Sequence, residues 1–309
     1  MKRYCVVGSL NMDMVTRIDR FPEPGETLRG RSFTIFPGGK GANQAVALAK
    51  LGAQVEMVGA LGDDVLGPRY RDVLAGAAIG TAGVAEIRGV STGTASIEVT
   101  VAGENHIIVV AGANDAVTPA YIESQRARIE ACDYLLLQLE IPLESVTLAA
   151  QIAHAAGIPV ILDPAPAQPL PPELYALVSI LTPNETEAHL LTGEDTGSDD
   201  GIARAGHALR SRGVASAIIK AGKRGAFLID GPTATHVPGF SVTVIDTVAA
   251  GDSFNAGLAL ALGDGASLLD AVRFANATGA LSTTREGAQS AMPTADEVRT
   301  LVARGSDVP

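Results

Sequence analysis

The chain has 309 residues, 47% of them hydrophobic, and a formal net charge of −11, so it can bury a large core as one large α/β domain or a domain with an appendage. The acidic balance, without a run of Lys or Arg longer than two, argues against a nucleic-acid or anionic-membrane partner, and no apolar stretch approaches the roughly 20 residues of a membrane span. The start of the chain lacks a signal-peptide cleavage pattern, and Cys5 and Cys132 lie in apolar runs as buried free thiols would, which together predict a cytoplasmic protein.

The first elements are a strand-like apolar run at Tyr4–Val7 and two alternating segments at about residues 12–36 and 92–110. In the first alternating segment Phe33 and Ile35 fall on one face, with polar residues between them. A period of two is typical of a sheet with one covered face and one open face. We interpret both segments as one small, discontinuous β appendage that serves as a lid; the alternative is an antiparallel edge of the main sheet.

A polar pair and a glycine-rich stretch accompany the first alternating segment. Asn11 and Asp13 are two residues apart on extended chain, so both point the same way and suit vicinal hydroxyls. The stretch GGKGANQ matches neither the dinucleotide-binding nor the P-loop fingerprint, which argues against a nicotinamide cofactor. It opens a helix over 39–50 in which Lys40 and Asn43 share one face. Because a cation at a helix N terminus is unfavourable without an anion or polar ligand, we expect Lys40 to bind a ligand rather than to be merely solvated.

From about residue 130 onward, short apolar runs alternate with helical patterns. The runs are Tyr134–Leu139, Ile158–Leu162, Leu177–Leu181 and Ala217–Ile219, and the helical patterns lie near 143–156, 185–192 and 199–212. This alternation is typical of βαβ units and a parallel sheet. We predict a three-layer α/β/α sandwich with a mostly parallel central sheet, forming one domain over residues 1–309 that carries the β lid.

Polar residues follow each of these four apolar runs. They are Glu140, Asp163, the stretch TPNETE at 182–187, and Lys220. Ligands of open parallel sheets bind outside the carboxyl ends of the strands. The four strand ends therefore predict a shared crevice.

The stretch DTVAAGDSFNAGLAL at 246–260 places a carboxylate where small residues join a strand-like run, Val242–Ile245, to an apolar helix. Ala249–Gly251 lets the backbone approach a ligand, and the helix start offers free N–H groups and a positive dipole end for a phosphoryl group. Asp252 is placed to take a proton from an attacking hydroxyl. The alternative is an N-terminal Asp that satisfies orphan N–H groups of the helix. As a base it needs no raised pKa, because the hydroxyl becomes acidic only as transfer proceeds.

Several longer motifs resemble the ribokinase-like (PfkB) carbohydrate kinases across nearly the whole chain. They are GSLNMD, FPEPGET, FPGGKGANQA, AGAND, QLEIPLESV, DPAPA, TPNETEA, DTVAAGDSFNAG and TREGAQ. The resemblance implies transfer of the γ-phosphoryl group of ATP to the 5-hydroxyl of D-ribose, assisted by Mg²⁺ and a monovalent cation, K⁺. It also implies that the β lid forms the interface of a homodimer.

The same resemblance assigns roles to individual positions. Catalysis falls to Asp252 as the base and to Ala250 and Gly251 as part of an anion hole. Sugar binding falls to Asn11, Asp13, Gly39, Lys40, Asn43 and Glu140. Nucleotide binding falls to Asn184, Glu187, Lys220, Gly222 and Asn276, with Glu187 also near Mg²⁺, directly or through water. The monovalent cation falls to a loop pair containing Asp246, Val248, Ser282, Arg285 and Gly287, largely through backbone carbonyls.

Three positions depart from the family pattern. Lys220 stands where Thr is usual, Asp163 replaces a frequent Asn, and Ala291 replaces a Ser that often contributes to the cation site. None of them belongs to the sugar clamp, so ribose remains the expected acceptor. The alternatives are a related kinase for another sugar or a nucleoside and, from a different class, a non-catalytic sugar or nucleotide sensor. An intact Asp252 argues against the sensor, which needs no base.

Overall fold

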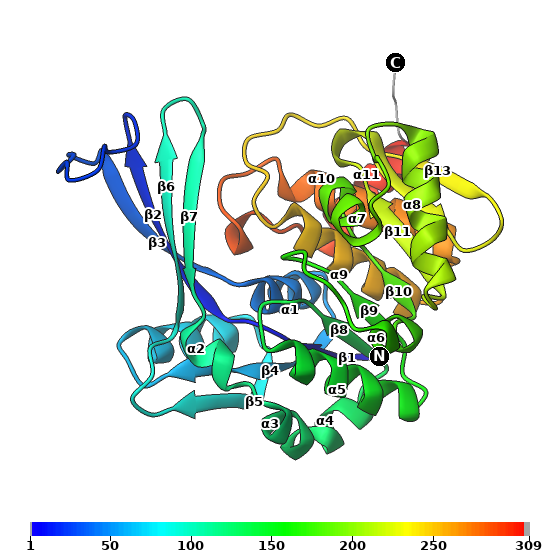
Figure 1. The fold of residues 1–309 in the computed structure, drawn as a ribbon, viewed down its shortest axis with the longest axis horizontal. Coiled ribbons are helices and arrows are strands. Elements are labelled where there is room, and N and C mark those ends of the chain that lie inside the picture. Colours follow the sequence, from blue (N-terminus) through cyan, green and yellow to red (C-terminus); the bar gives the residue numbers. More distant parts are fainter. Residues whose placement is uncertain (1, 306–309) are drawn as a thin grey trace.

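The computed structural model describes residues 2–305, which form a nine-stranded sheet between two layers of helices and a separate four-stranded sheet (Figure 1). The strand order of the large sheet is β13-β12-β11-β10-β9-β8-β1-β4-β5, and all but β12 run parallel to one another. Its strands are β1 (Arg3–Val7), β4 (Gln54–Gly62), β5 (Gly80–Ile87), β8 (Tyr134–Leu137), β9 (Val160–Leu162), β10 (Ile180–Leu181), β11 (Ser216–Lys220), β12 (Gly225–Ile229) and β13 (Ala234–Pro238). The predicted three-layer α/β/α sandwich with a mostly parallel sheet is confirmed.

Two hydrophobic cores lie on the two faces of the large sheet, because successive strand residues point to opposite faces. Tyr4 and Val6 belong to one core, whereas Cys5 and Val7 belong to the other. The first core is covered by α1 (Lys40–Lys50), α2 (Leu66–Gly76), α9 (Ala250–Gly263), α10 (Leu268–Ser282) and α11 (Ala295–Arg304). The second is covered by α3 (Pro119–Ser124), α4 (Arg126–Glu130), α5 (Leu143–Ala155), α6 (Pro172–Leu177), α7 (Glu185–Thr192) and α8 (Asp199–Ser211). Strands buried on both faces explain why their sequences read as continuous apolar runs.

The small sheet stands away from the α/β body (Figure 1). Its strand order is β3-β2-β6-β7, with strands β2 (Asn11–Ile18), β3 (Ser32–Gly38), β6 (Gly93–Thr100) and β7 (Asn105–Val110). The alternative that these segments form an edge of the main sheet is therefore wrong.

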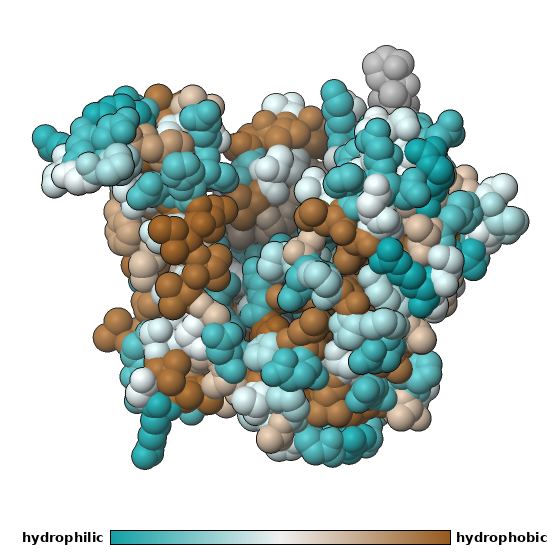
Figure 2. Space-filling model, in the orientation of Figure 1, coloured by the Kyte–Doolittle hydropathy of each residue, from teal (hydrophilic) through white to brown (hydrophobic). Residues whose placement is uncertain are grey.

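The expected covered face of the small sheet is covered only near its base. Met12 and Ala95 are buried there, but Phe33 is 59% exposed and every residue of β7 is exposed. Figure 2 shows hydrophobic side chains gathered over β7, beside the hollow between the small sheet and the body.

Two predicted strands differ from the structure. Leu177–Leu181 contributes only β10, because Leu177 still belongs to α6. Val242–Ile245 is not a strand: Ile245 N donates to Thr283 O (2.7 Å), so a loop contact replaces a strand ladder. Alternating apolar residues there face a cavity instead of a sheet.

The described helices are too short or too polar for a membrane span, and the two cysteines lie inside the protein. Within residues 2–305, no helix is both long enough and apolar enough to cross a bilayer. Cys5 and Cys132 are buried free thiols, as predicted.

Candidate active site

A cavity of about 960 Å³ opens at the carboxyl ends of the parallel strands, beside the N termini of α1, α7 and α9. Residues from three of the four predicted strand ends line it: Asp163 after β9, Asn184 and Glu187 after β10, and Lys220 at the end of β11. The fourth, Glu140 after β8, lies next to it and accepts a hydrogen bond from Lys40 N (3.0 Å). The prediction that these strand ends share one crevice is confirmed.

The N terminus of α9 faces this cavity. The helix begins at Ala250 after Ala249, a non-glycine residue in the left-handed region with φ of 59°. Such a conformation costs energy and is typical of functional turns. Ala250, Gly251 and Asp252 line the cavity, and the first-turn N–H groups of a helix have no carbonyl partner within it. Ala250 N donates to Thr247 O at a long 3.3 Å, so the N–H groups of the following first-turn residues and the helix dipole are the features most available to an anion.

Asp252 is buried and held from another helix. Its Oδ2 accepts from Asn43 Nδ2 (3.1 Å) and its Oδ1 from Gln44 Nε2 (3.2 Å), both on α1. These bonds come from side chains of α1 and not from the first turn of α9, so the alternative of a simple helix cap lacks the contacts that it requires.

The charge state of Asp252 depends on its surroundings. Burial raises the pKa of Asp252 to about 6; Lys40 opposes this rise and Asp163 reinforces it. The role as base does not require this rise, and the sequence did not reveal how completely the carboxylate is desolvated. A carboxylate with this pKa is still mostly ionised at neutral pH.

Lys40 supplies the opposite charge. Burial lowers the pKa of its ammonium, but Asp252, Asp163 and Glu140 raise it, with a net shift upward. Lys40 therefore remains a cation inside the cavity that it lines. Asn43 bonds Asp252 and Lys40 feels its charge, so both residues of this predicted helix face lie toward Asp252.

The predicted sugar residues meet at the base of the small sheet. Asn11 is buried, and its Oδ1 accepts from Asn114 Nδ2 (2.7 Å). Burial, with the nearby charges of Glu140 and Asp252, raises the pKa of Asp13 to about 7. Gly39 has φ of 86°, and a Cβ there would lie 2.7 Å from Asn11 N, so only glycine fits between α1 and β2.

The predicted nucleotide residues line the other end of the cavity. Asn184 and Glu187 form a capping box at the start of α7: Glu187 N donates to Asn184 Oδ1 (2.8 Å) and Asn184 N to Glu187 Oε2 (2.7 Å). Burial raises the pKa of Glu187, and Lys220 opposes the rise. Asn276 Nδ2 donates to Val237 O (2.9 Å), which ties α10 to β13, and Gly222 is open to the cavity.

The predicted monovalent-cation residues come from two loops that the structure brings together. The Asp246 carboxylate accepts from Val248 N (3.0 Å) and from Gly287 N (2.9 Å). Ser282 donates to Gly279 O (2.8 Å), whereas the Arg285 side chain points away to pair with Glu297. Side chains therefore organise the loops, and backbone carbonyls, the ligands that K⁺ takes in channel filters, remain the candidate donors.

No three His, Cys, Asp or Glu side chains gather as a metal cage within residues 2–305. Mg²⁺ in phosphoryl-transfer sites is usually held by water, one or two carboxylates and substrate phosphates, so a single carboxylate from the protein can be enough. Glu187, which lines the cavity, is the carboxylate available for that role.

The sequence analysis missed several polar residues that support the site. Gln44 holds Asp252 and is itself held by Gln138 Nε2 (2.6 Å). Asn114 holds Asn11, and Gln289 Nε2 donates to Asn43 Oδ1 (3.2 Å). The signal for Gln44 was its position beside Asn43 in the first turn of α1; Asn114 and Gln289 gave none beyond lying within motifs.

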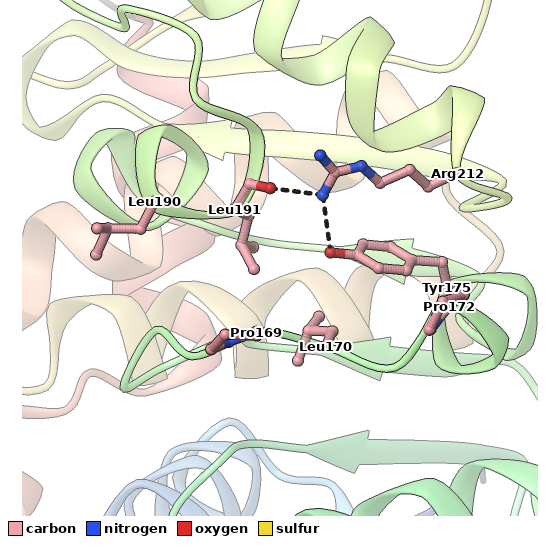
Figure 3. Close-up of a pocket in the computed structure, with 7 residues that line it drawn as sticks. All are labelled: Pro169, Leu170, Pro172, Tyr175, Leu190, Leu191 and Arg212. Atoms are coloured by element: carbon pink, nitrogen blue, oxygen red, sulfur yellow. Dashed lines mark hydrogen bonds between the residues drawn. The ribbon is translucent and has the colours of Figure 1, made fainter.

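A second cavity, of about 430 Å³, lies between α6 and α7, away from this site. Its only charged lining residue, Arg212, is already engaged by Tyr175 Oη (3.1 Å) and Leu191 O (2.5 Å) (Figure 3). No Asp, Glu or His of the described residues lines this cavity, so it offers no carboxylate or imidazole base for phosphoryl transfer.

Known proteins resemble this chain over nearly its full length. The sequence matches the family described as pfkB family carbohydrate kinase over residues 1–295. A ribokinase of Haemophilus influenzae is 42% identical over 296 residues, covering 96% of this chain and 97% of that protein. A ribokinase of Bacillus subtilis is 44% identical over 302 residues, covering 98% of this chain and 100% of that protein. The structure of Arabidopsis thaliana ribokinase complexed with ribose and ATP has a TM-score of 0.93 and 34% identity, covering 97% of this chain and 98% of that chain.

Proposed function

This chain belongs to the pfkB family of carbohydrate kinases, and we propose that it transfers the γ-phosphoryl group of ATP to the 5-hydroxyl of D-ribose. The observation that carries the proposal is the ionisable Asp252 carboxylate, buried at the N terminus of α9 beside a cavity that can hold a nucleotide. The base and the anion site are thus one residue apart in the chain.

Each end of the site has a task in this reaction. Asn11, Asp13, Gly39, Lys40, Asn43 and Glu140 hold the sugar so that its 5-hydroxyl meets Asp252. The cavity lined by Asn184, Glu187, Lys220, Gly222 and Asn276 holds ATP. Asp252 accepts the hydroxyl proton as the new O–P bond forms, and the N–H groups of Ala250 and Gly251 stabilise the charge on the transferring group. Such catalysis consists mostly of positioning and electrostatic stabilisation.

Metal ions complete the proposal. Mg²⁺ bound with ATP neutralises charge on the phosphates. Glu187 would hold it through water, and the loops around Asp246 and Gly287 would hold K⁺ through backbone carbonyls. An ion there orders the turn that precedes α9, since the Asp246 carboxylate already links both loops.

We further propose that the small sheet acts as a lid and joins two copies of the chain. Its support is the run of exposed apolar residues on the edge strand β7, from Ile107 to Val110, together with Phe33. An exposed apolar edge strand is an aggregation hazard unless it is covered, and a second copy would cover it. The cytoplasmic location stays a prediction from the sequence.

Two other functions remain distinct from this one. A related kinase for another sugar or a nucleoside would keep Asp252 and change the sugar end. A sensor without catalysis would bind the same ligands and transfer nothing. The buried, amide-held Asp252 favours an enzyme over a sensor, because binding alone does not need a desolvated carboxylate.

We predict that Asp252→Asn lowers kcat by on the order of 10²–10⁴, the usual worth of a general base. ATP-analogue affinity should change little, because the amide keeps the size of the carboxylate. Asp270→Asn is the matched control: Asp270 is also the third residue of its helix, α10, but it is exposed and bonded only to Ser267. If both variants keep kcat within about threefold of the parent, the role as base is wrong.

We predict that ribose is a better substrate than 2-deoxyribose or fructose by roughly tenfold or more in kcat/KM. A site that hydrogen-bonds hydroxyls rejects analogues lacking them, since the half-buried Asp13 carboxylate would lose a hydroxyl partner. A coupled assay of ADP release over pentoses, hexoses and nucleosides measures this. Equal efficiency with fructose would remove ribose as the acceptor and leave the kinase in place.

We predict that activity rises when Na⁺ is exchanged for K⁺ at fixed ionic strength. The reason is that a monovalent ion between the loops of Asp246 and Gly287 would order the neighbouring anion site. Initial rates at saturating ribose and ATP test it. Identical rates in the two salts would mean that Ala291, which is buried beside α1 where the family often has Ser, has removed the ion's effect or that no ion binds.

A further inference from the structure

Two departures from the family pattern form a buried ion pair. Lys220 Nζ lies 2.8 Å from Asp163 Oδ1, and the two side chains are only 14% and 3% exposed. They end strands β11 and β9, which flank β10 in the sheet. Removing one partner of such a pair leaves an uncompensated buried charge. Lys220 and Asp163 therefore form one coupled unit.

The ion pair is connected to the base. Gln44 Nε2 donates to Asp252 Oδ1 (3.2 Å) and also lies 3.4 Å from Asp163 Oδ2. A single amide thus stands between two buried carboxylates. The negative charge of Asp163 raises the pKa of Asp252. Lys220 counters that charge from the other side of Asp163.

The ammonium also lies at the anion site. A Cβ placed on Gly251 would be 3.3 Å from Lys220 Nζ, so Nζ sits against the first turn of α9. An anion held by the first-turn N–H groups would lie within reach of this cation. A hydroxyl of Thr at the same position offers a hydrogen bond but no charge.

We propose that Lys220 is a catalytic cation for phosphoryl transfer and that Asp163 is the positioning residue that holds it against the N terminus of α9. The inference rests on the proposed function and deepens it. As the bond from the acceptor oxygen to phosphorus forms and the bond from phosphorus to the ADP oxygen breaks, the acceptor proton passes to Asp252. The Lys220 ammonium stabilises the charge on the transferring group.

Charges on every side of Asp252 enter its proton affinity. Lys40 faces it from α1, Glu140 from the end of β8, Asp163 from the end of β9, and Asp13 lies close enough to feel its charge. Lys40 is the cation among these groups, so Lys220 is needed to balance Asp163. Removal of Lys220 alone should therefore make Asp252 harder to ionise.

A double-mutant cycle tests the Lys220–Asp163 ion pair; it consists of Lys220→Thr, Asp163→Asn and the two substitutions combined. Lys220→Thr should lower kcat at least about tenfold and move the acid limb of the pH profile of kcat/KM upward. Adding Asp163→Asn should reverse the upward move, because no unpaired buried carboxylate remains, but it should leave kcat as low as in Lys220→Thr, because Asp163 acts on the reaction only through the cation that both variants lack. If Lys220→Thr does not fold, Lys220→Gln, which is one atom shorter than Lys and carries no charge, takes its place.

The matched control is the pair of Lys2 and Asp133. It has the same residue types and the same Nζ–Oδ1 distance of 2.8 Å, but it is exposed and lies far from the cavity. The cycle of Lys2→Thr and Asp133→Asn should leave kcat and the pH profile unmoved. Additive effects at Lys220 and Asp163, or a change in thermal stability with kcat and the pH profile of the parent, would overturn the proposal.

Measuring nucleotide affinity tests the role of Lys220 without any acceptor, so its outcome does not depend on which sugar the enzyme phosphorylates. Lys220→Thr should weaken a non-hydrolysable ATP analogue at least about fivefold more than ADP, since the additional phosphoryl group is the one that meets the ammonium. The result holds whichever sugar or nucleoside the parent phosphorylates. An unchanged ratio of the two affinities would show that Lys220 does not touch the transferred group and would overturn its catalytic role.

Discussion

Burial of one carboxylate at the start of α9 is the constraint on which this site depends. Asp252 can stay there because Asn43 and Gln44 donate to its two oxygens, and these residues come from α1, whose own first turn carries Lys40. The pairing fixes α1 against α9 on the same face of the sheet. Because α1 follows the small sheet directly, the same contact also fixes where the sugar residues of β2 stand.

Much of the fold follows from periodicity in the sequence. Apolar runs such as Tyr134–Leu139 and the alternation around Phe33 identified strands of the two sheets, since burial on both faces or one face leaves a different pattern. The failures have the same origin. Val242–Ile245 alternates like a strand but lines a cavity, and Leu177 is apolar because it ends a helix. The pattern of apolar residues along the sequence predicts which side chains are buried, but not which element or cavity they face.

Some relations between the site residues follow from their spacing in the sequence, and others are visible only in the folded structure. Lys40 and Asn43 are neighbours on one helix turn, so their joint role was predictable. The partners of Asp163 and Lys220 were not, because 57 residues separate them and each looked like an isolated departure. The raised pKa of Asp252 was also not predictable from the sequence, because it depends on charges from α1 and from the ends of β8 and β9. The features that could not be predicted are thus mostly contacts between residues far apart in the sequence.

The central claim is that the ionised form of the buried Asp252 is the base. Its most direct test is the pH dependence of kcat at saturating ribose and ATP, followed at constant ionic strength with the folded state checked at each pH, because kcat/KM would also report Asp13, whose pKa is raised to about 7. A carboxyl whose pKa is raised to about 6 loses its charge below that pH, so activity should be full near neutrality and fall with one proton as pH drops through about 6. A profile that stays flat down to pH 5, or activity that instead rises as the solution becomes acidic, would contradict the claim.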